Sequence, residues 1–540
     1  MDIIAFEKKL KNLLRKSPET NRQEIVQNLK VTFTPSLDLG DYSTNLLFLL
    51  KKYAPEKEEI ILNLIKKWEG VYFKKIEILP NGFINFYLSD LILIKNLRDL
   101  AKNIRKYFSS NKGFGRKVNI DFVSANPTGP LTLGNGRSLV LGNALAEILK
   151  LNNFKVTKEY FVNDRGNQIR TLGESIKAVI FNLPMKENYY RGDYIIEVAE
   201  KLKNKISEKD KDEDVGRKAG EIILENYIKP VINDFGVKYD VFYYESSLYK
   251  KDLPQKILKI LKQKDLISEK EGALWLNLTK LGEIKDEVLI KKDGEATYFF
   301  SDILYHYEKI KIRKFKYVIL IVGADHLDHV RRLKKALSIL GIKESQIKPI
   351  VYQLVNIKKG ESFVRMSKRK GIFITLKDLM DEIGLAPIVI YFLKTSPERH
   401  LIIELELAKK ESEENPAWYL LYAYVRLNQI LLKAKKLGYK ERKIDYQKMA
   451  AELINKEIYR DLVREVVVIK NLFLIIANNF SVHLLGEELI KFAKLIHNFY
   501  EKERILTIPL SERKLTFVKI LKDTLGFLFD IINLPKLEKM

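Results

Sequence analysis

A loop of small and polar residues between two apolar segments has the composition of a ligand-binding turn. It reads SANPTGPLTLGNGRS, from Ser124 to Ser138, and it joins VNIDFV to LVLGNALAEILKL. Gly134 and Gly136 would let the backbone approach a ligand, and Arg137 adds a fixed positive charge. The free N–H groups at the start of a following helix would favour a phosphate or a carboxylate. The alternative is an ordinary turn, since neither a dinucleotide-binding fingerprint nor a phosphate-loop motif is present.

A second segment, ESFVRMSKRKGIFITL, concentrates positive charge. It holds four cations within six residues: Arg365, Lys368, Arg369 and Lys370. A loop of Lys, Ser and Gly can wrap a triphosphate and stabilise charge that develops during transfer. The alternative is a solvated basic loop without a ligand.

Two further pairs have spacings that suit a binding site. Tyr298 and Asp302 are four residues apart, so a helix would place them on one face, where a carboxylate and an aromatic ring can together hold a cation. Asp325 and His326 directly follow the apolar run KYVILIVG, at the expected end of a strand. The alternatives are an amphipathic helix with core aromatics in the first case and helix capping by Asp325 in the second.

The elements around these residues predict a parallel sheet. A strand at VNIDFV, the glycine-rich loop, a helix over 137–151 and a strand at FKVTKEYFVN form a βαβ unit. The pattern recurs at KYVILIVGADH, which leads into another helix. We therefore expect a Rossmann-like, doubly wound domain over 111–395, carrying an insertion at about 185–295.

The flanking segments predict two more domains. Residues 1–110 combine helical periodicity with a hairpin, VYFKKIEILPNGFINFYL, as a small α+β domain would. Residues 396–540 are dominated by helical periodicity and predict an all-α helix bundle. The stretch 416–540 is basic, with 22 Lys and Arg against 14 Asp and Glu.

Composition limits the possible partners and cofactors. The net charge of +25 suggests a polyanionic partner such as nucleic acid, although a general richness in lysine is an alternative. Cysteine is absent, which excludes disulfides and thiolate metal sites, and the six histidines lack metal-ligand spacing. The start, MDIIAFEKKLKNLL, is unlike a secretory signal, and the longest apolar run is broken by Lys470. We expect a cytoplasmic protein without zinc or a membrane span.

These segments together resemble the arginyl-tRNA synthetases, a class I synthetase family. ANPTGPLTLGNGR is similar to ANPTGPLHIGHGR, the HIGH signature of that family, and YFVNDRGNQI is similar to its YYVNDAGNQI. VGADH and RMSKRKGIFITL resemble its GADH and KMSKS segments. LGDYSTN and PNGFINFYL resemble its N-terminal domain, and SEENPAWYLLYAYVRLNQIL resembles the start of its anticodon-binding domain. The resemblance covers the whole chain, and the motifs occur in the same order as in that family.

The resemblance implies a reaction, its partners and three groups of site residues. The reaction is the ATP-dependent activation of L-arginine, with Mg²⁺ and without a prosthetic group, followed by transfer to tRNA(Arg) by a monomeric enzyme. The implied arginine-binding residues are Asp121, Ser124, Asn126, Tyr298, Asp302 and either Asp325 or His326. The implied ATP-binding residues are Pro130, Gly134, Gly136, Arg137, Met366 and Ser367. The implied catalytic residues are Thr132, Asn135, Arg365 and Lys368.

The chain departs from the family at the HIGH motif. The two histidines of the motif are replaced by Thr132 and Asn135, which donate hydrogen bonds but carry no charge. Losing charge-assisted donors at such a site can cost about 10²-fold in rate. An active enzyme is the first hypothesis, and a synthetase-like protein that binds tRNA with impaired activity is the alternative. A generic basic RNA-binding scaffold is a third, but it leaves Tyr298 and Asp302 unexplained.

Overall fold

The computed structural model describes residues 2–15, 22–363 and 374–540. The chain divides into two compact units. The larger unit comprises Gly113–Trp418 and Ile531–Leu534, and the other comprises Met1–Lys112, Tyr419–Asp530 and Pro535–Met540. Within the described ranges, no helix is long and apolar enough to cross a bilayer. The domain boundaries expected from the sequence, 1–110, 111–395 and 396–540, stay a prediction.

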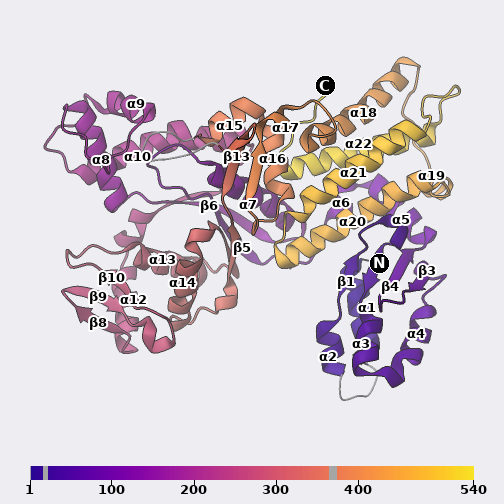
Figure 1. The fold of residues 1–540 in the computed structure, drawn as a ribbon, viewed down its shortest axis with the longest axis horizontal. Helices are drawn as coiled ribbons and strands as arrows, with labels where there is room; N and C mark the ends of the chain where they lie inside the picture. The colour runs from indigo at the N-terminus through magenta and orange to yellow at the C-terminus, as the bar shows by residue number, and fades with distance from the viewer. Residues whose placement is uncertain (1, 16–21, 364–373) are drawn as a thin grey trace. The chain divides into compact units, whose positions relative to one another are not determined.

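A five-stranded parallel sheet forms the centre of the larger unit (Figure 1). Its order is β12-β11-β5-β6-β7, and every neighbouring pair is parallel. The strands are β5 (Lys117–Phe122), β6 (Lys155–Val162), β7 (Val241–Tyr244), β11 (Tyr317–Gly323) and β12 (Ile347–Tyr352). Strand β5 buries five of its six residues, as a central strand covered on both faces must. The predicted doubly wound sheet is confirmed.

The order of the sheet fixes where a ligand can bind. From β5 the chain continues to β6 and β7 on one side, whereas β11 and β12 lie on the other. Ligands of such sheets bind at the carboxyl ends of the strands where the direction of winding reverses. Here that point lies between β5 and β11, so the segments that follow these two strands must form the site.

Helices follow both of these strands. After β5 the chain enters α7 (Leu133–Leu151), and after β11 it passes through a 3-10 turn, η7 (Ala324–His326), into α14 (Leu327–Ile339). Helix α7 begins four residues before the predicted start at Arg137. Helix α13 (Tyr298–Tyr307) precedes β11 and continues into a π-helical turn, η6 (Glu308–Ile312).

The segment expected as an insertion is not continuous, because β7 belongs to the main sheet. Before β7, three helices form a group (Figure 1): α8 (Asn167–Ile180), α9 (Asp193–Leu202) and α10 (Asp212–Ile223). Helices α8 and α10 touch backbone to backbone, since a Cβ on Gly173 would lie 1.8 Å from the Asp212 carbonyl oxygen. After β7 come α12 (Leu253–Gln263) and a second sheet of β8 (Ile267–Lys270), β9 (Ala273–Leu276) and β10 (Glu287–Ile290). Between α10 and β7 lies α11 (Lys229–Asp234).

The rest of the larger unit supports α7. It consists of β13 (Val355–Lys359), β14 (Ser362–Phe363), β15 (Leu401–Glu404), α15 (Leu376–Ile383), α16 (Leu385–Lys394) and α17 (Leu405–Lys409). A Cβ on Gly136 would lie 2.5 Å from Leu376 and 2.9 Å from Phe392. Gly136 therefore serves close packing of α7 against α15 and α16.

The first part of the other unit confirms the predicted α+β character. A four-stranded sheet has the order β1-β2-β4-β3, with β1 (Val31–Phe33), β2 (Tyr42–Thr44), β3 (Phe73–Ile78) and β4 (Ile84–Leu88). Strands β3 and β4 pair antiparallel as the predicted hairpin. The helices are α1 (Ile3–Arg15), α2 (Arg22–Asn28), α3 (Leu46–Tyr53), α4 (Glu58–Lys66), α5 (Asp90–Lys102) and α6 (Ile104–Phe108).

Long helices make up the second part of this unit, as the sequence predicts. They are α18 (Pro416–Lys436), α19 (Tyr446–Leu453), α20 (Glu457–Asn479), α21 (Leu484–Lys502) and α22 (Glu512–Ile532). The two parts share a buried ion pair, because Arg464 Nε of α20 donates to Asp41 Oδ1 at 2.7 Å. The N-terminal and C-terminal segments therefore pack as one body.

Candidate active site

A cavity of about 1500 Å³ opens where the order of the sheet predicts a site. It is lined by the segment after β5, the ends of β6 and β11, and parts of α13 and α14. Ten of the predicted site residues line it: Asp121, Ser124, Asn126, Pro130, Thr132, Asn135, Tyr298, Asp302, Asp325 and His326. The structure therefore brings together candidates that are up to 205 residues apart in the sequence.

The segment after β5 turns sharply into the cavity. Val123 and Ser124 have φ angles of 67° and 37°, a region that L-residues rarely adopt and that is costly for a β-branched side chain. Hydrogen bonds hold this turn: Val123 N–H donates to Ser138 Oγ at 3.0 Å, and Tyr160 Oη donates to the Ala125 carbonyl at 2.8 Å. The turn is thus over-determined by its surroundings.

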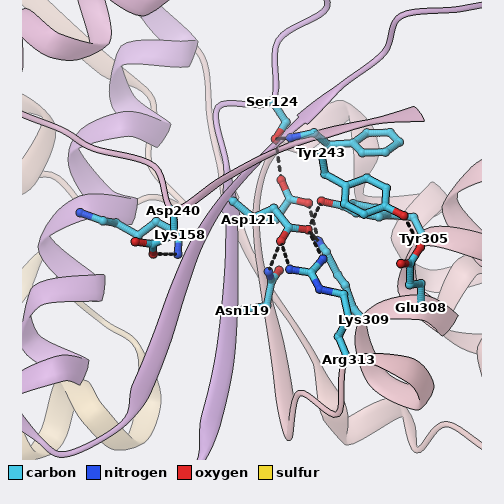
Figure 2. Close-up of polar contacts among 12 residues, drawn as sticks. Asn119, Asp121, Ser124, Lys158, Asp240, Tyr243, Tyr305, Glu308, Lys309 and Arg313 are labelled. Atoms are coloured by element: carbon cyan, nitrogen blue, oxygen red, sulfur yellow. Dashed lines mark hydrogen bonds and ion pairs between the residues drawn. The ribbon is translucent and has the colours of Figure 1, made fainter. Parts of the chain in front are cut away.

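The Asp121 carboxylate has partners on both oxygens (Figure 2). Ser124 Oγ donates to Asp121 Oδ1 at 2.5 Å, and Lys309 Nζ donates to Asp121 Oδ2 at 2.7 Å. Ser124 Oγ also accepts a hydrogen bond from Phe161 N–H at 2.9 Å. The resemblance implies substrate contacts for Asp121 and Ser124; in the structure both line the cavity, bond to each other and are held by Lys309 and Phe161.

A second buried carboxylate, Glu159, lies beside this group. Its side chain is fully buried and accepts hydrogen bonds from Arg313, from Tyr305 Oη at 2.6 Å and from Asn119 Nδ2 at 3.1 Å. Lys309 Nζ lies 3.8 Å from Glu159 Oε1. Two carboxylates and two cations therefore neutralise one another beneath the cavity.

Thr132 and Asn135, the residues at the positions of the HIGH histidines, bond to each other. Asn135 Oδ1 accepts from Thr132 N–H at 2.9 Å and from Thr132 Oγ1 at 2.8 Å. This arrangement caps the first turn of α7, which explains why the helix begins before Arg137. The Asn135 NH₂ group retains the chemistry of a donor to an anion.

Arg137 is not brought to the cavity, in contrast to the prediction that it binds ATP. Its side chain is fully buried, and its guanidinium donates to the carbonyls of Gln353, Thr395, Ser396 and Arg399. Burial lowers the pKa of Arg137 to about 10. Its charge joins three segments of the fold instead of facing a ligand.

The predicted Tyr298 and Asp302 pair does lie in the cavity, on the first turns of α13. Tyr298 is half-exposed, whereas Asp302 is 6% exposed. Asp302 Oδ2 lies 2.6 Å from His329 Nε2, and the His329 ring packs 5.3 Å from the Tyr298 ring. The nearby Asp302 carboxylate raises the pKa of Tyr298 well above its ordinary value. A buried carboxylate next to an aromatic face suits a cation.

Glu245 adds a second acid that the sequence analysis missed. It is buried, lines the cavity and accepts from Ser301 Oγ at 2.6 Å and Asn163 Nδ2 at 3.0 Å. Burial raises its pKa, and the nearby Asp302 charge adds to the effect. The strand pattern DVFYY immediately before Glu245 could have shown that it stands at a strand end.

Other lining residues were also missed by sequence reasoning. His306 is buried, its Nδ1 bonds to the Asp302 carbonyl at 2.8 Å, and burial lowers its pKa to about 4. The stretch from Glu187 to Tyr194 forms a further wall, where Tyr194 Oη donates to the Thr128 carbonyl at 3.0 Å. His329 and His306 gave no signal because each is a lone histidine on a helix.

The remaining candidates fall in three groups. Asp325 and His326 both line the cavity and are largely exposed, with 3.6 Å between Asp325 Oδ2 and His326 Nε2. Gly134 lies close to Tyr352, which lines the cavity. Arg365, Met366, Ser367 and Lys368 lie outside the described residues. Across the described ranges, no cluster of His, Cys, Asp and Glu is arranged to hold a metal ion.

Comparison with known families covers nearly the whole chain. Residues 97–386 match the family described as tRNA synthetases class I (R), catalytic domain. Residues 5–88 match the arginyl tRNA synthetase N terminal domain, and residues 420–540 match the DALR anticodon binding domain. The chain belongs to the arginyl-tRNA synthetases.

Individual relatives of this family agree. The chain is 35% identical to the arginine–tRNA ligase of Thermotoga maritima, over 88% of this chain and 89% of that protein. It is 34% identical to the arginine–tRNA ligase of Caldanaerobacter subterraneus, over 96% of this chain and 94% of that protein. The arginyl-tRNA synthetase structure from Thermus thermophilus has the same fold, with a TM-score of 0.75, 20% identity and full coverage of both chains. The resemblance drawn from the sequence motifs is confirmed.

Proposed function

We propose that this arginyl-tRNA synthetase is an active arginine–tRNA ligase. The carboxylate oxygen of L-arginine attacks the α-phosphorus of ATP, which forms arginyl-adenylate and releases pyrophosphate. The 2′-hydroxyl of the terminal adenosine of tRNA(Arg) then attacks the arginyl carbonyl and releases AMP. The family and the ligase names of the relatives support this reaction.

The observation that carries the proposal is the acidic pocket at the switch point of the sheet. Asp302 and Glu245 are buried carboxylates without a Lys or Arg ion-pair partner in the described structure, and Tyr298 stands beside them. A guanidinium has five donors in a plane, so it can bond to two carboxylates while its face meets the Tyr298 ring. We propose that the arginine side chain binds here.

The backbone end of the substrate would then face the loop after β5. Asn126, Pro130, Thr132, Asn135 and Gly134 lie at or next to the cavity on this side, where the start of α7 favours the phosphates of ATP. Mg²⁺ would enter with ATP as part of the substrate. Lys368 and Arg365 would stabilise the charge of the transferring phosphate, as the resemblance implies. Asp325 or His326 would complete the pocket.

The remaining parts of the chain would bind tRNA. The C-terminal helices match an anticodon-binding domain and carry excess positive charge, which suits contacts with phosphates. The N-terminal domain would contact the tRNA elsewhere. We propose that the enzyme acts as a cytoplasmic monomer, which light scattering of the purified chain can test.

Arginine-dependent exchange of pyrophosphate into ATP, with and without tRNA(Arg), tests the proposal. Transfer of labelled arginine to tRNA tests the second step. We expect both activities. Intact tRNA binding without exchange under either condition would contradict the proposal and would mean that Thr132 and Asn135 do not replace the two imidazoles.

A further inference from the structure

Lys309 is a buried cation that the reaction described above does not use. Its side chain is fully buried, its Nζ lies 2.7 Å from Asp121 Oδ2, and the same atom stands 3.7 Å from the centroid of the Tyr305 ring. Burying an ion pair costs desolvation, so an apolar pair of similar volume would often be at least as stable. A buried pair of this kind is better explained by the geometry that it enforces.

The geometry in question is the turn that opens the site. The 2.5 Å hydrogen bond from Ser124 Oγ to Asp121 Oδ1 couples the position of Ser124 to the orientation of the Asp121 carboxylate. Ser124 is one of the two residues of this turn with positive φ. Such backbone persists only where surrounding contacts over-determine it. Lys309 fixes the oxygen of Asp121 that Ser124 does not use, so the carboxylate cannot rotate away from the turn.

Lys309 also connects this turn with the other side of the cavity. It belongs to the π-helical turn η6, which directly continues α13, the helix that carries Tyr298 and Asp302. Arg313, at the end of the same turn, donates to Glu159 of β6 at 2.9 Å. Turns of this kind often occur at functional sites. The two ion pairs hold α13 at a fixed position relative to β5 and β6.

We propose that Lys309 is a positioning residue for the reaction: through Asp121 and Ser124 it sets the loop after β5 at a fixed distance from the pocket on α13. The guanidinium end of arginine is held on α13, whereas its reacting carboxylate must meet ATP at the loop. A displacement of about 1 Å between these two sides can cost about 10²-fold in rate. This inference rests on the proposed function.

The decisive comparison uses Lys309→Met, the double variant Asp121→Asn with Lys309→Met, and a control. Lys309→Met leaves the Asp121 carboxylate buried and unpaired, so we expect kcat for arginine-dependent exchange to fall about 10²-fold. In the double variant the amide that replaces this carboxylate carries no charge but still accepts from Ser124, and we expect about tenfold recovery. Lys251→Met, which removes the half-exposed cation paired with the neighbouring buried Glu308, should leave kcat unchanged, because Tyr243 still donates to Glu308.

A small inhibitor separates positioning from general damage. Butylguanidine carries the guanidinium that the pocket on α13 would hold, but it lacks the amino and carboxylate groups that would meet the loop. Its inhibition constant should therefore stay within about twofold of wild type in Lys309→Met, while kcat falls. If the inhibition constant of butylguanidine rises by the same factor as kcat falls, the pocket itself is damaged and the proposal is overturned.

Failure of this inference can be told apart from failure of the proposed function. If wild type shows no exchange, the proposed function fails. If wild type is active and folded Lys309→Met retains kcat within about threefold, or the double variant recovers nothing, the positioning role fails alone. Should Lys309→Met melt below the assay temperature, Ser124→Ala cuts the same link with a smaller change. A loss of kcat in that variant, with unchanged butylguanidine inhibition, would support the role, and unchanged kcat would refute it.

Discussion

His329 Nε2 lies 2.6 Å from Asp302 Oδ2, within the pocket proposed for the arginine side chain. The acceptor is a buried carboxylate, and the donor comes from the first turn of α14, after β11. An imidazole that donates through Nε2–H holds this carboxylate in a fixed orientation. The pair thus joins α13, which precedes β11, to α14, which follows it.

Replacing Asp302 by Asn tests the role of its charge in arginine binding. The substitution keeps the shape but removes the negative charge opposite the guanidinium. We expect the arginine KM to rise about 10²-fold, as for loss of one member of a desolvated charge pair, with the ATP KM nearly unchanged. Steady-state pyrophosphate exchange with each substrate varied in turn measures both constants. Asp328→Asn, which changes an exposed acid on α14, is the control. Similar increases in the two KM values would speak against a guanidinium site.

Substitutions of His329 test whether it acts by donating to Asp302. Gln can donate from a similar position, whereas Phe fills the space without a donor. We expect an arginine KM within about threefold of wild type for His329→Gln and about tenfold higher for His329→Phe, the value of one hydrogen bond to a charged group. The arginine KM of each variant, measured by pyrophosphate exchange, distinguishes the two outcomes. A Phe variant that binds arginine as well as wild type would remove His329 from the pocket's function.

Glu245 predicts a pH dependence of arginine binding. Its pKa is raised by burial, and the cationic guanidinium favours its ionised form. As the pH falls through this raised pKa, Glu245 takes up a proton and the arginine KM should increase. The increase should begin at a higher pH than an ordinary carboxyl group would give. Arginine KM measured from pH 8 to pH 5 should rise less steeply in Glu245→Gln. Identical slopes in both proteins would exclude Glu245 as the titrating group.

Local patterns in the sequence predict much of this site, but not its long-range partners. The loop after β5 and the spacing of Tyr298 and Asp302 are local features, so their places at the cavity could be foreseen. Arg137 has the sequence context of a residue that binds an anion. In the structure its guanidinium donates instead to backbone carbonyls more than two hundred residues away. The strand pattern before Glu245 could have placed it at a strand end, but not beside Ser301. His329 and Lys309 could not be predicted, because only the folded chain brings them to Asp302 and Asp121. No pattern in one sequence encodes such pairings.

Thr132 and Asn135 make a prediction about the altered HIGH motif. Since Asn135 Oδ1 caps the helix at Thr132, Asn135→Ala should lower both stability and activity. The lost cap is worth about 1 kcal/mol, and a donor near the phosphates is worth about 10²-fold in kcat. Asn135→Asp keeps the cap but places a negative charge beside the phosphates, so we expect normal stability with a large loss of kcat. Thermal melts and exchange rates of the two variants distinguish the roles. Normal kcat in Asn135→Asp would mean that this position does not face ATP.

His306 makes a prediction about stability in acid. Its pKa in the folded protein is lowered to about 4 by burial, against an ordinary value of about 6.5. Between these two values the unfolded chain binds a proton that the folded chain does not, so stability must rise with pH across this range. The shift contributes about 3 kcal/mol to the free energy of unfolding at pH 7, and this contribution is fully lost only near pH 4. His306→Gln, which keeps a donor to the Asp302 carbonyl, should therefore show a smaller drop in melting temperature between pH 7 and pH 5 than wild type. An equal drop in the two proteins, measured by scanning calorimetry, would show that the imidazole is accessible to protons in the folded state.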